Sequence, residues 1–317
     1  LKRENGLDWK AENIVVSTGA KHSLANMIEV LVKKGEEVII LGPYWVSYAE
    51  MVKLAEGKSV ILDGSFENDF KVTPEQIEAA ITPKTKIIMY ASPNNPTGSV
   101  YSEAELRAIA AIVAKNPNIF VLADEIYEYI NFTPEGHFSI GSIPEIKDRV
   151  ITVNGFSKGF AMTGWRVGFI AAAKWIADAV DKLQGQVTSG TNSIAQKAAA
   201  IAFTNMDAPK MMLEAYKRRR DLVIAKLKEV PGFKVRVPDG AFYAFPDVSS
   251  YFGKTDGKVT INNADELCLW LLETAHIAVV TGNAFGAPNC IRISTAAADE
   301  KLVEAIERMK KALATLQ

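Results

Sequence analysis

The chain has 317 residues, of which 48% are hydrophobic and 23% charged, and its 36 basic and 37 acidic side chains leave a formal net charge of −1. This composition is typical of a globular enzyme and excludes a disordered chain, a collagen-like repeat and a small disulfide scaffold. The near-neutral charge gives no electrostatic attraction to nucleic acid or to an acidic membrane, and the length predicts about two domains.

Short apolar segments alternate with helical patterns in the first two thirds of the chain. The predicted strands are residues 14–17, 38–41, 60–62, 86–91, 119–123, 150–153 and 168–172. Nearly continuous apolar strands are typical of a mainly parallel sheet that is buried on both faces. Helices are predicted over 20–33, from Thr73 onward, and over 102–115, where Ser102 and Glu105 have the spacing of a capping box. The alternation predicts an α/β fold with a doubly wound, mainly parallel seven-stranded sheet.

The pattern changes after about residue 205. A long basic helix is predicted over 209–230, and we interpret its KRRR run as a solvated helix face rather than a nucleic-acid site. An alternating, turn-rich stretch follows, then a helix over 264–275, a strand pair near residues 277–294 and a final helix from Asp299. We therefore predict a large domain over 1–207 and a smaller C-terminal α+β domain over 208–317 that includes the interdomain helix.

Cysteine content and hydropathy bear on location. Cys268 and Cys290 are too few for a disulfide framework, which fits a reducing compartment, and we expect a cytoplasmic protein. No apolar run approaches the length that spans a bilayer, and no signal peptide opens the chain. The chain begins LKRENGLDW without an initiator methionine, so we expect it to be part of a longer protein.

Ligands of open α/β sheets bind beyond the carboxyl ends of the strands, so the residues that follow each strand are candidates for a site. Gly19, Ala20 and Lys21 open a helix, where free N–H groups suit a phosphate, although a plain strand–helix turn is favoured on this signal alone. Trp45 would stack on a planar ligand or simply pack. Asn95, in a turn with two prolines, would aim its amide at a ligand oxygen or form an Asx-turn.

Three charged side chains follow later strands. Asp124 is costly to bury unless it faces a cation, and a structural ion pair is the alternative to a ligand. Lys158 lies in an apolar stretch where a lysine can lose its proton and act as an amine nucleophile, and Arg166 can hold a phosphate bidentately. Together these groups match what pyridoxal phosphate requires for its aldehyde, ring nitrogen and phosphate. We expect no metal site.

Five motifs occur in an order that is characteristic of one family. They are PYWVSY, SPNNPTG, ADEIYEY, GFSKGFAMTGWRVG and CIRIS. The chain resembles the class I (fold type I) aminotransferases over essentially its whole length, and it is most similar to the Iβ subgroup of aspartate aminotransferases.

The resemblance implies a role for each matching residue. Lys158 matches the lysine that bonds to the cofactor aldehyde and later moves the substrate proton. Asp124 matches the partner of the ring nitrogen, while Tyr127 and Asn95 match the groups that hydrogen-bond the phenolic oxygen. Trp45 matches the residue that stacks on the ring.

The remaining roles concern the phosphate and the substrate. Gly19, Ala20 and Lys21 match the phosphate loop, and Arg166 matches the phosphate arginine. Arg292, in CIRIS, matches the arginine that binds the substrate α-carboxylate, with Asn95 and Trp45 assisting.

Two departures from the family pattern stand out. Many relatives have a serine three residues before the lysine, where this chain has Gly155, so one phosphate donor is either missing or replaced by Ser157. The family also has an N-terminal segment before the point that matches Leu1, and we expect this chain to lack it, which leaves the activity of this polypeptide open.

The resemblance implies a homodimer with composite active sites that acts on amino acids and 2-oxo acids. The expected reaction is ping-pong amino transfer between aspartate and 2-oxoglutarate. An aromatic or alanine aminotransferase, or a cysteine-conjugate type β-lyase, stays open because no second substrate arginine is assignable. A non-catalytic, pyridoxal-phosphate-binding sensor domain is the remote alternative.

Overall fold

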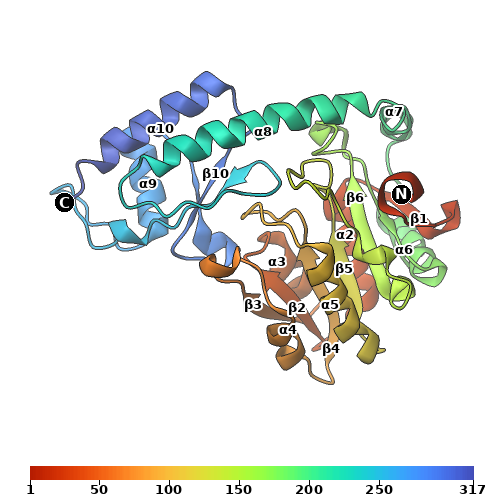
Figure 1. Ribbon diagram of the computed structural model, residues 1–317. Coiled ribbons are helices and arrows are strands. Elements are labelled where there is room, and N and C mark those ends of the chain that lie inside the picture. Colours follow the sequence, from red (N-terminus) through yellow and green to blue (C-terminus); the bar gives the residue numbers. More distant parts are fainter.

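The structure, a computed structural model, describes residues 1–317 and has two packed regions that are joined by one long helix (Figure 1). The larger region is built on a seven-stranded sheet of order β1-β7-β6-β5-β4-β2-β3. The smaller region holds a three-stranded sheet of order β8-β10-β9. The predicted α/β fold is therefore confirmed.

Every predicted apolar segment of the first two thirds of the chain forms a strand of the large sheet. The strands are β1 Ile14–Ser17, β2 Glu37–Gly42, β3 Lys58–Asp63, β4 Thr85–Ala91, β5 Phe120–Asp124, β6 Val150–Gly155 and β7 Gly168–Ala171. Only β7 runs antiparallel to its neighbours. The other pairs are parallel and need crossover connections, so helices cover the sheet.

Side-chain caps mark the N-termini of three of the seven helices of the large region, at Thr73, Ser102 and Asn192. The seven helices are α1 Lys2–Asn5, α2 Ala20–Leu31, α3 Ser47–Leu54, α4 Pro74–Ala80, α5 Glu103–Lys115, α6 Lys174–Val187 and α7 Ser193–Ala202. Both predicted capping boxes are present, Thr73 with Gln76 and Ser102 with Glu105. Helices α1, α3, α6 and α7 are additions to the predicted set.

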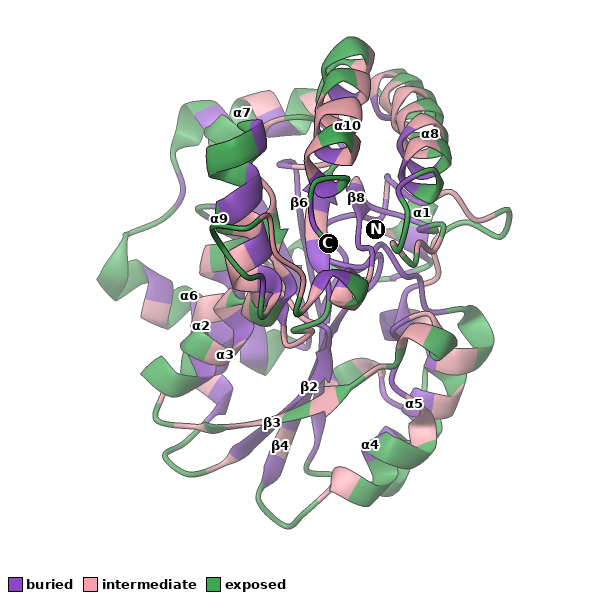
Figure 2. Ribbon diagram, turned by 90° about the vertical axis from the view of Figure 1, so that its left-hand side faces the viewer, coloured by how far each residue is buried: buried purple, intermediate pink, exposed green.

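The core lies on both faces of the large sheet, and strands such as β2, β5 and β6 are buried along their whole length (Figure 2). Neighbouring residues of β2 point to opposite faces, because side chains alternate along a strand. Ile40 packs in the apolar cluster that contains Leu24 of α2, whereas Ile39 packs in the cluster that contains Leu106 of α5. The two-sided burial explains why these strands are apolar without interruption.

The C-terminal region has its own core. It consists of α8 Asp207–Lys228, α9 Ala264–Ala275, α10 Asp299–Leu313 and the short antiparallel strands β8 Tyr243–Ala244, β9 Val280–Thr281 and β10 Ile291–Ser294. Leu227, Leu271 and Ile306 meet in one buried cluster. The arginines of the KRRR run are paired with Asp299 and Asp221 on the helix surface. None of the helices combines the length and apolar character that crossing a membrane requires.

Candidate active site

A cavity of about 360 Å³ opens between the two regions, at the carboxyl end of the large sheet. Ten of the predicted site residues line it, namely Ala20, Lys21, Trp45, Asn95, Asp124, Tyr127, Ser157, Lys158, Arg166 and Arg292. The eleventh, Gly19, adjoins Arg166. The strand-end rule thus explains how Gly19, Asp124 and Lys158, which follow or end three different strands, come to one place, since parallel strands end at the same edge of a sheet. Arg292 is contributed by the other sheet.

Asp124 ends β5 and is 4% exposed. Its Oδ2 accepts a hydrogen bond from the hydroxyl of Tyr48 at 2.6 Å, and its Oδ1 accepts one from the backbone N–H of Ile126 at 3.2 Å. Burial raises the pKa of Asp124 from 3.8 to about 6, although both hydrogen bonds oppose the rise. Because a phenol and an amide hold this carboxylate and no cation bonds to it, the buried carboxylate is suited to a cationic group of a ligand.

Lys158 follows β6 and projects among aromatic rings. Its Nζ lies 5.7 Å from the ring centroid of Tyr127 and 5.5 Å from that of Phe242. Burial lowers the pKa of Lys158, and the charges of Arg292 and Arg166 lower it further, against the opposing charge of Asp124. A lowered pKa increases the fraction of uncharged amine, which is the form that attacks a carbonyl carbon.

The start of α2 forms a cradle for an anion. A Cβ at Gly19, whose φ is +81°, would overlap the guanidinium of Arg166. Glycine therefore lets Arg166 lie against the N-terminus of this helix, where no side chain caps the N–H groups. Nη1 of Arg166 donates to the carbonyl oxygen of Thr163 at 2.9 Å, which orients the guanidinium. Free N–H groups beside an arginine suit a phosphate group.

The structure gives a reason for glycine at position 155. A Cβ there would lie 2.8 Å from Cα of Gly168 and 2.8 Å from the carbonyl oxygen of Val167, in the pairing of β6 with β7. A serine therefore does not fit without a backbone shift. Ser157, the candidate replacement for that donor, lines the cavity and is 8% exposed.

Arg292 comes from β10 and bridges the two regions. Its Nη1 donates to Oδ1 of Asn95 at 2.8 Å. Its guanidinium carbon lies 4.6 Å from the ring centroid of Tyr243 and 4.8 Å from that of Phe285. This half-buried guanidinium faces the cavity and has further N–H donors beyond the one that bonds to Asn95. It is therefore suited to bind a carboxylate group of a ligand.

Among the lining residues that were not predicted from the sequence are two tyrosines, Tyr48 and Tyr243. Tyr48 lies in the PYWVSY motif, three residues after Trp45, and the two rings meet edge to face with centroids 5.6 Å apart. Trp45 lies just before α3 and Tyr48 lies in its first turn, so their place in one aromatic motif is the sequence signal for this pairing. Tyr243 lies in the alternating stretch GAFYAF, which gives no signal beyond a strand.

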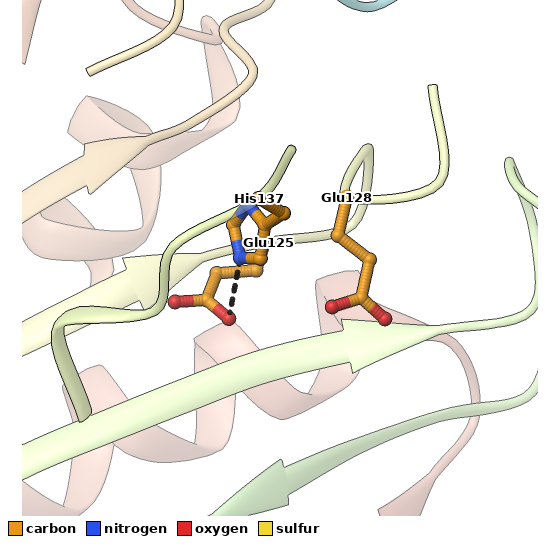
Figure 3. Close-up of side chains that lie close together, drawn as sticks. All are labelled: Glu125, Glu128 and His137. Atoms are coloured by element: carbon orange, nitrogen blue, oxygen red, sulfur yellow. Dashed lines mark ion pairs between the residues drawn. The ribbon is translucent and has the colours of Figure 1, made fainter. Parts of the chain in front are cut away.

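Two other features lie outside this cavity. One is an apolar cavity of about 540 Å³ lined by Ile14 and Phe203 among others, without a set of converging charges. The other is a buried group of Glu125, Glu128 and His137 (Figure 3). Nε2 of His137 lies 3.1 Å from Oε2 of Glu125, so these two groups form a buried ion pair. Burial alone would lower the pKa of His137, but Glu125 raises it overall.

Comparisons with known proteins agree with the geometry of the cavity. Residues 1–309 match the family profile described as "Aminotransferase class I and II". The chain belongs to this family, and the resemblance found in its motifs is confirmed.

Individual relatives cover most of the chain. It is 46% identical to the "Bifunctional aspartate aminotransferase and glutamate/aspartate-prephenate aminotransferase" of Petunia hybrida, over 100% of this chain and 67% of that protein. Its fold matches the aspartate aminotransferase of Rhizobium meliloti with a TM-score of 0.96 at 39% identity, over 100% of this chain and 80% of the other. An aromatic aminotransferase from Pyrococcus horikoshii matches with a TM-score of 0.92 at 38% identity, over 99% and 83% of the two chains. The chain thus spans about two thirds of the Petunia protein.

Proposed function

We propose that this protein is a pyridoxal-phosphate-dependent aminotransferase that moves the amino group between aspartate and 2-oxoglutarate by a ping-pong mechanism. The arrangement that carries the proposal is a single cavity with a buried carboxylate, an amine of lowered pKa and an anion cradle, and with Arg292 facing them from the other region. This set fits the three polar ends of pyridoxal phosphate.

The residues of the cavity would hold the cofactor by complementary groups. The carboxylate of Asp124 would keep the ring nitrogen protonated, while Arg166 and the N-terminus of α2 would bind the phosphate. Trp45 would cover the ring, and Tyr127 and Asn95 would hydrogen-bond the phenolic oxygen. When bound, the cofactor supplies an acceptor for the electrons that are released when the substrate α-proton leaves.

Lys158 and Arg292 would act on the substrate itself. Lys158 would hold the cofactor covalently, and its amine, once displaced by the substrate amine, would take the α-proton as a general base. Arg292 would bind the α-carboxylate with two parallel hydrogen bonds and so orient the Cα–H bond toward Lys158. Gly19, Ala20, Lys21 and Ser157 would complete the phosphate site.

The choice of aspartate rests on the relatives, whose names include aspartate aminotransferases at 40–46% identity. Arg166 and Arg292 are the two arginines that line the cavity, so the residue that selects the donor side chain is not assigned. The aromatic aminotransferase of Pyrococcus horikoshii supports aromatic amino acids as the second candidate donor class.

The protein is further proposed to be a cytoplasmic homodimer. Ile194 and Ile201 of α7 are 73% and 69% exposed, and they flank the part of α7 that borders the apolar cavity. Large exposed apolar side chains beside an apolar hollow support an interface between subunits. The separate core of the C-terminal region supports a domain boundary near 207/208.

An absorbance spectrum and a donor panel test the proposal. Incubation with pyridoxal phosphate should give a protein-bound absorbance band that borohydride abolishes. Steady-state assays with 2-oxoglutarate should then rank aspartate above alanine and aromatic donors. A protein that binds no cofactor would refute the proposed function, whereas a panel led by an aromatic donor would change only the substrate.

A further inference from the structure

Tyr243 lies where the two regions meet, and no role has so far been given to it. It belongs to β8, is 6% exposed and lines the cavity. Its hydroxyl is 2.8 Å from the hydroxyl of Tyr127, which comes from the large region. Its ring lies under the guanidinium of Arg292. Tyr243 therefore contacts one residue that faces the cofactor site and one that faces the substrate site.

The strand register explains the contact with Arg292. Tyr243 of β8 is paired with Ser294 of β10. Residues two apart on a strand share a face, so Arg292 is a diagonal neighbour of Tyr243 across the two strands. The phenol ring offers its negative face to the guanidinium, which keeps this cation in place while its donors stay directed at Asn95 and the cavity.

A bound ligand determines which hydroxyl donates the hydrogen bond between Tyr127 and Tyr243. A phenol has one proton to donate, and its oxygen can accept as well. If Tyr127 donates its proton to an oxygen in the cavity, the 2.8 Å contact persists only with Tyr243 as the donor. Burial raises the pKa of both phenols, so both keep their protons at neutral pH.

We propose that Tyr243 is a positioning residue that joins the two halves of the active site. Its hydroxyl donates to Tyr127 and thereby turns the Tyr127 proton toward the cofactor, and its ring supports Arg292 for carboxylate binding. This inference rests on the proposed function, because it requires a cofactor at Tyr127 and a carboxylate at Arg292.

Two substitutions separate the contribution of the Tyr243 hydroxyl from that of its ring. Tyr243→Phe keeps the ring and removes the donor. Tyr127 then becomes a weaker donor to the anionic phenolic oxygen, so the pKa of the cofactor–lysine chromophore should rise by roughly 0.3 to 1 pH unit. Tyr243→Leu also removes the aromatic face, and it should weaken the binding of maleate, an unreactive dicarboxylate, by about 2- to 30-fold. Maleate binding to Tyr243→Phe should stay within about 2-fold of the wild type.

The experiment uses the cofactor-loaded protein, with absorbance followed against pH and against maleate concentration. Tyr251→Phe is the matched control, because the hydroxyl of Tyr251 donates to the carbonyl oxygen of Pro231 within the C-terminal region, away from the cavity. Melting temperatures of the cofactor-free variants report any loss of folding. The control should change neither the chromophore nor the maleate affinity.

A second comparison holds even if Tyr243→Leu does not fold. Adding Tyr243→Phe to Tyr127→Phe should move the chromophore pKa no further, since the two hydroxyls act in series. A chromophore pKa that Tyr243→Phe leaves unchanged, or an equal further shift in the double variant, overturns the hydroxyl link. Unchanged maleate affinity in a folded Tyr243→Leu variant overturns the role of the ring. A wild-type protein that binds no cofactor refutes the proposed function instead.

Discussion

The two regions build the same cavity in different ways. The large region contributes groups that lie at the ends of strands. Fully buried side chains such as Ile88 and Val121 pack these strands into the core. The C-terminal region contributes Arg292 and Tyr243 from a sheet whose strands are only two to four residues long. Under the proposed roles, the groups that act on the cofactor stand on the large sheet, whereas Arg292, the proposed ligand of the substrate carboxylate, comes from a separately packed unit.

Several polar contacts join the two regions. Some lie beside the cavity, whereas others, such as the ion pair of Arg236 with Asp69, involve no residue that lines it. Arg292 bonds to Asn95, Tyr243 bonds to Tyr127, and the backbone N–H of Gly240 donates to the carbonyl oxygen of Gly98 at 2.8 Å. A change in either partner of the contacts with Arg292 or Tyr243 is therefore expected to act directly on the cavity. The predictions below test this division of roles.

The largest effect is expected in the large region at Lys158. Lys158→Ala should bind pyridoxal phosphate noncovalently and lose transamination, because both the covalent link and the base are removed. Borohydride reduction and peptide mass mapping of the wild type should place the pyridoxyl group on Lys158. Lys182→Ala, an exposed change on α6, is the control. Labelling at a different lysine would contradict the assignment of Lys158 as the lysine that holds the cofactor.

Asp124→Asn should lower kcat by roughly 100- to 1000-fold while cofactor binding is largely kept. The amide cannot hold the ring nitrogen in its charged form, whereas the phosphate contacts of Arg166 are untouched. Single-turnover kinetics with aspartate and a cofactor titration measure the two effects separately. Near-normal turnover would mean that Asp124 is only a structural carboxylate.

The C-terminal region is tested at Arg292. Lysine cannot reproduce the two parallel hydrogen bonds of a guanidinium, so Arg292→Lys should raise KM and lower kcat for every amino donor. One lost charge-assisted bond corresponds to about 10- to 150-fold in kcat/KM. Arg218→Lys, on the surface of α8, should change nothing. A penalty confined to acidic donors would instead make Arg292 a side-chain selector.

The two regions are expected to differ in the sign with which a buried or hydrogen-bonded carboxylate changes their stability as the pH rises. The pKa of Asp124 is raised to about 6 by burial, so its contribution to the stability of the cofactor-free protein falls as the pH rises from about 4 to about 6. Asp124→Asn should therefore melt higher than the wild type at pH 8 and lose that advantage at pH 4.

The pKa of Asp256, in the C-terminal region, is shifted in the opposite direction from that of Asp124, so Asp256 serves as the control. Its pKa is lowered to about 2, chiefly by the hydrogen bond from the indole of Trp270. Its stabilising contribution is present above pH 4 and is lost as the pH falls toward 2. Asp256→Asn should therefore melt lower than the wild type at pH 8. The same sign for both variants would contradict the assigned environments.

The smallest effects are expected at two helix caps. Ser102 caps α5 in the large region, and Asn263 caps α9 in the C-terminal region. Replacing either with alanine should cost about 1 kcal/mol of local stability, because one backbone N–H of the first helical turn loses its partner. Thermal melting measures the loss, and kcat and KM should stay unchanged. Altered kinetics in the Asn263→Ala variant alone would show that the C-terminal region is coupled to the cavity through more than its polar contacts.

Local features of the sequence determined the elements and much of the site. Continuous apolar segments marked the strands, and Ser102 with Glu105 marked the start of α5, since periodicity and capping depend on neighbours within a few residues. The strand-end rule then indicated Asp124 and Lys158 without knowledge of their partners.

Only the tertiary structure decided which distant groups meet. The bond between Arg292 and Asn95 joins residues 197 positions apart, and the hydroxyl contact of Tyr127 with Tyr243 joins residues 116 apart. Neither appears as a spacing in the sequence, because both depend on how the C-terminal core packs against the large sheet. The need for glycine at 155 is likewise visible only once β6 and β7 are paired, since the atoms that exclude a side chain there belong to the neighbouring strand.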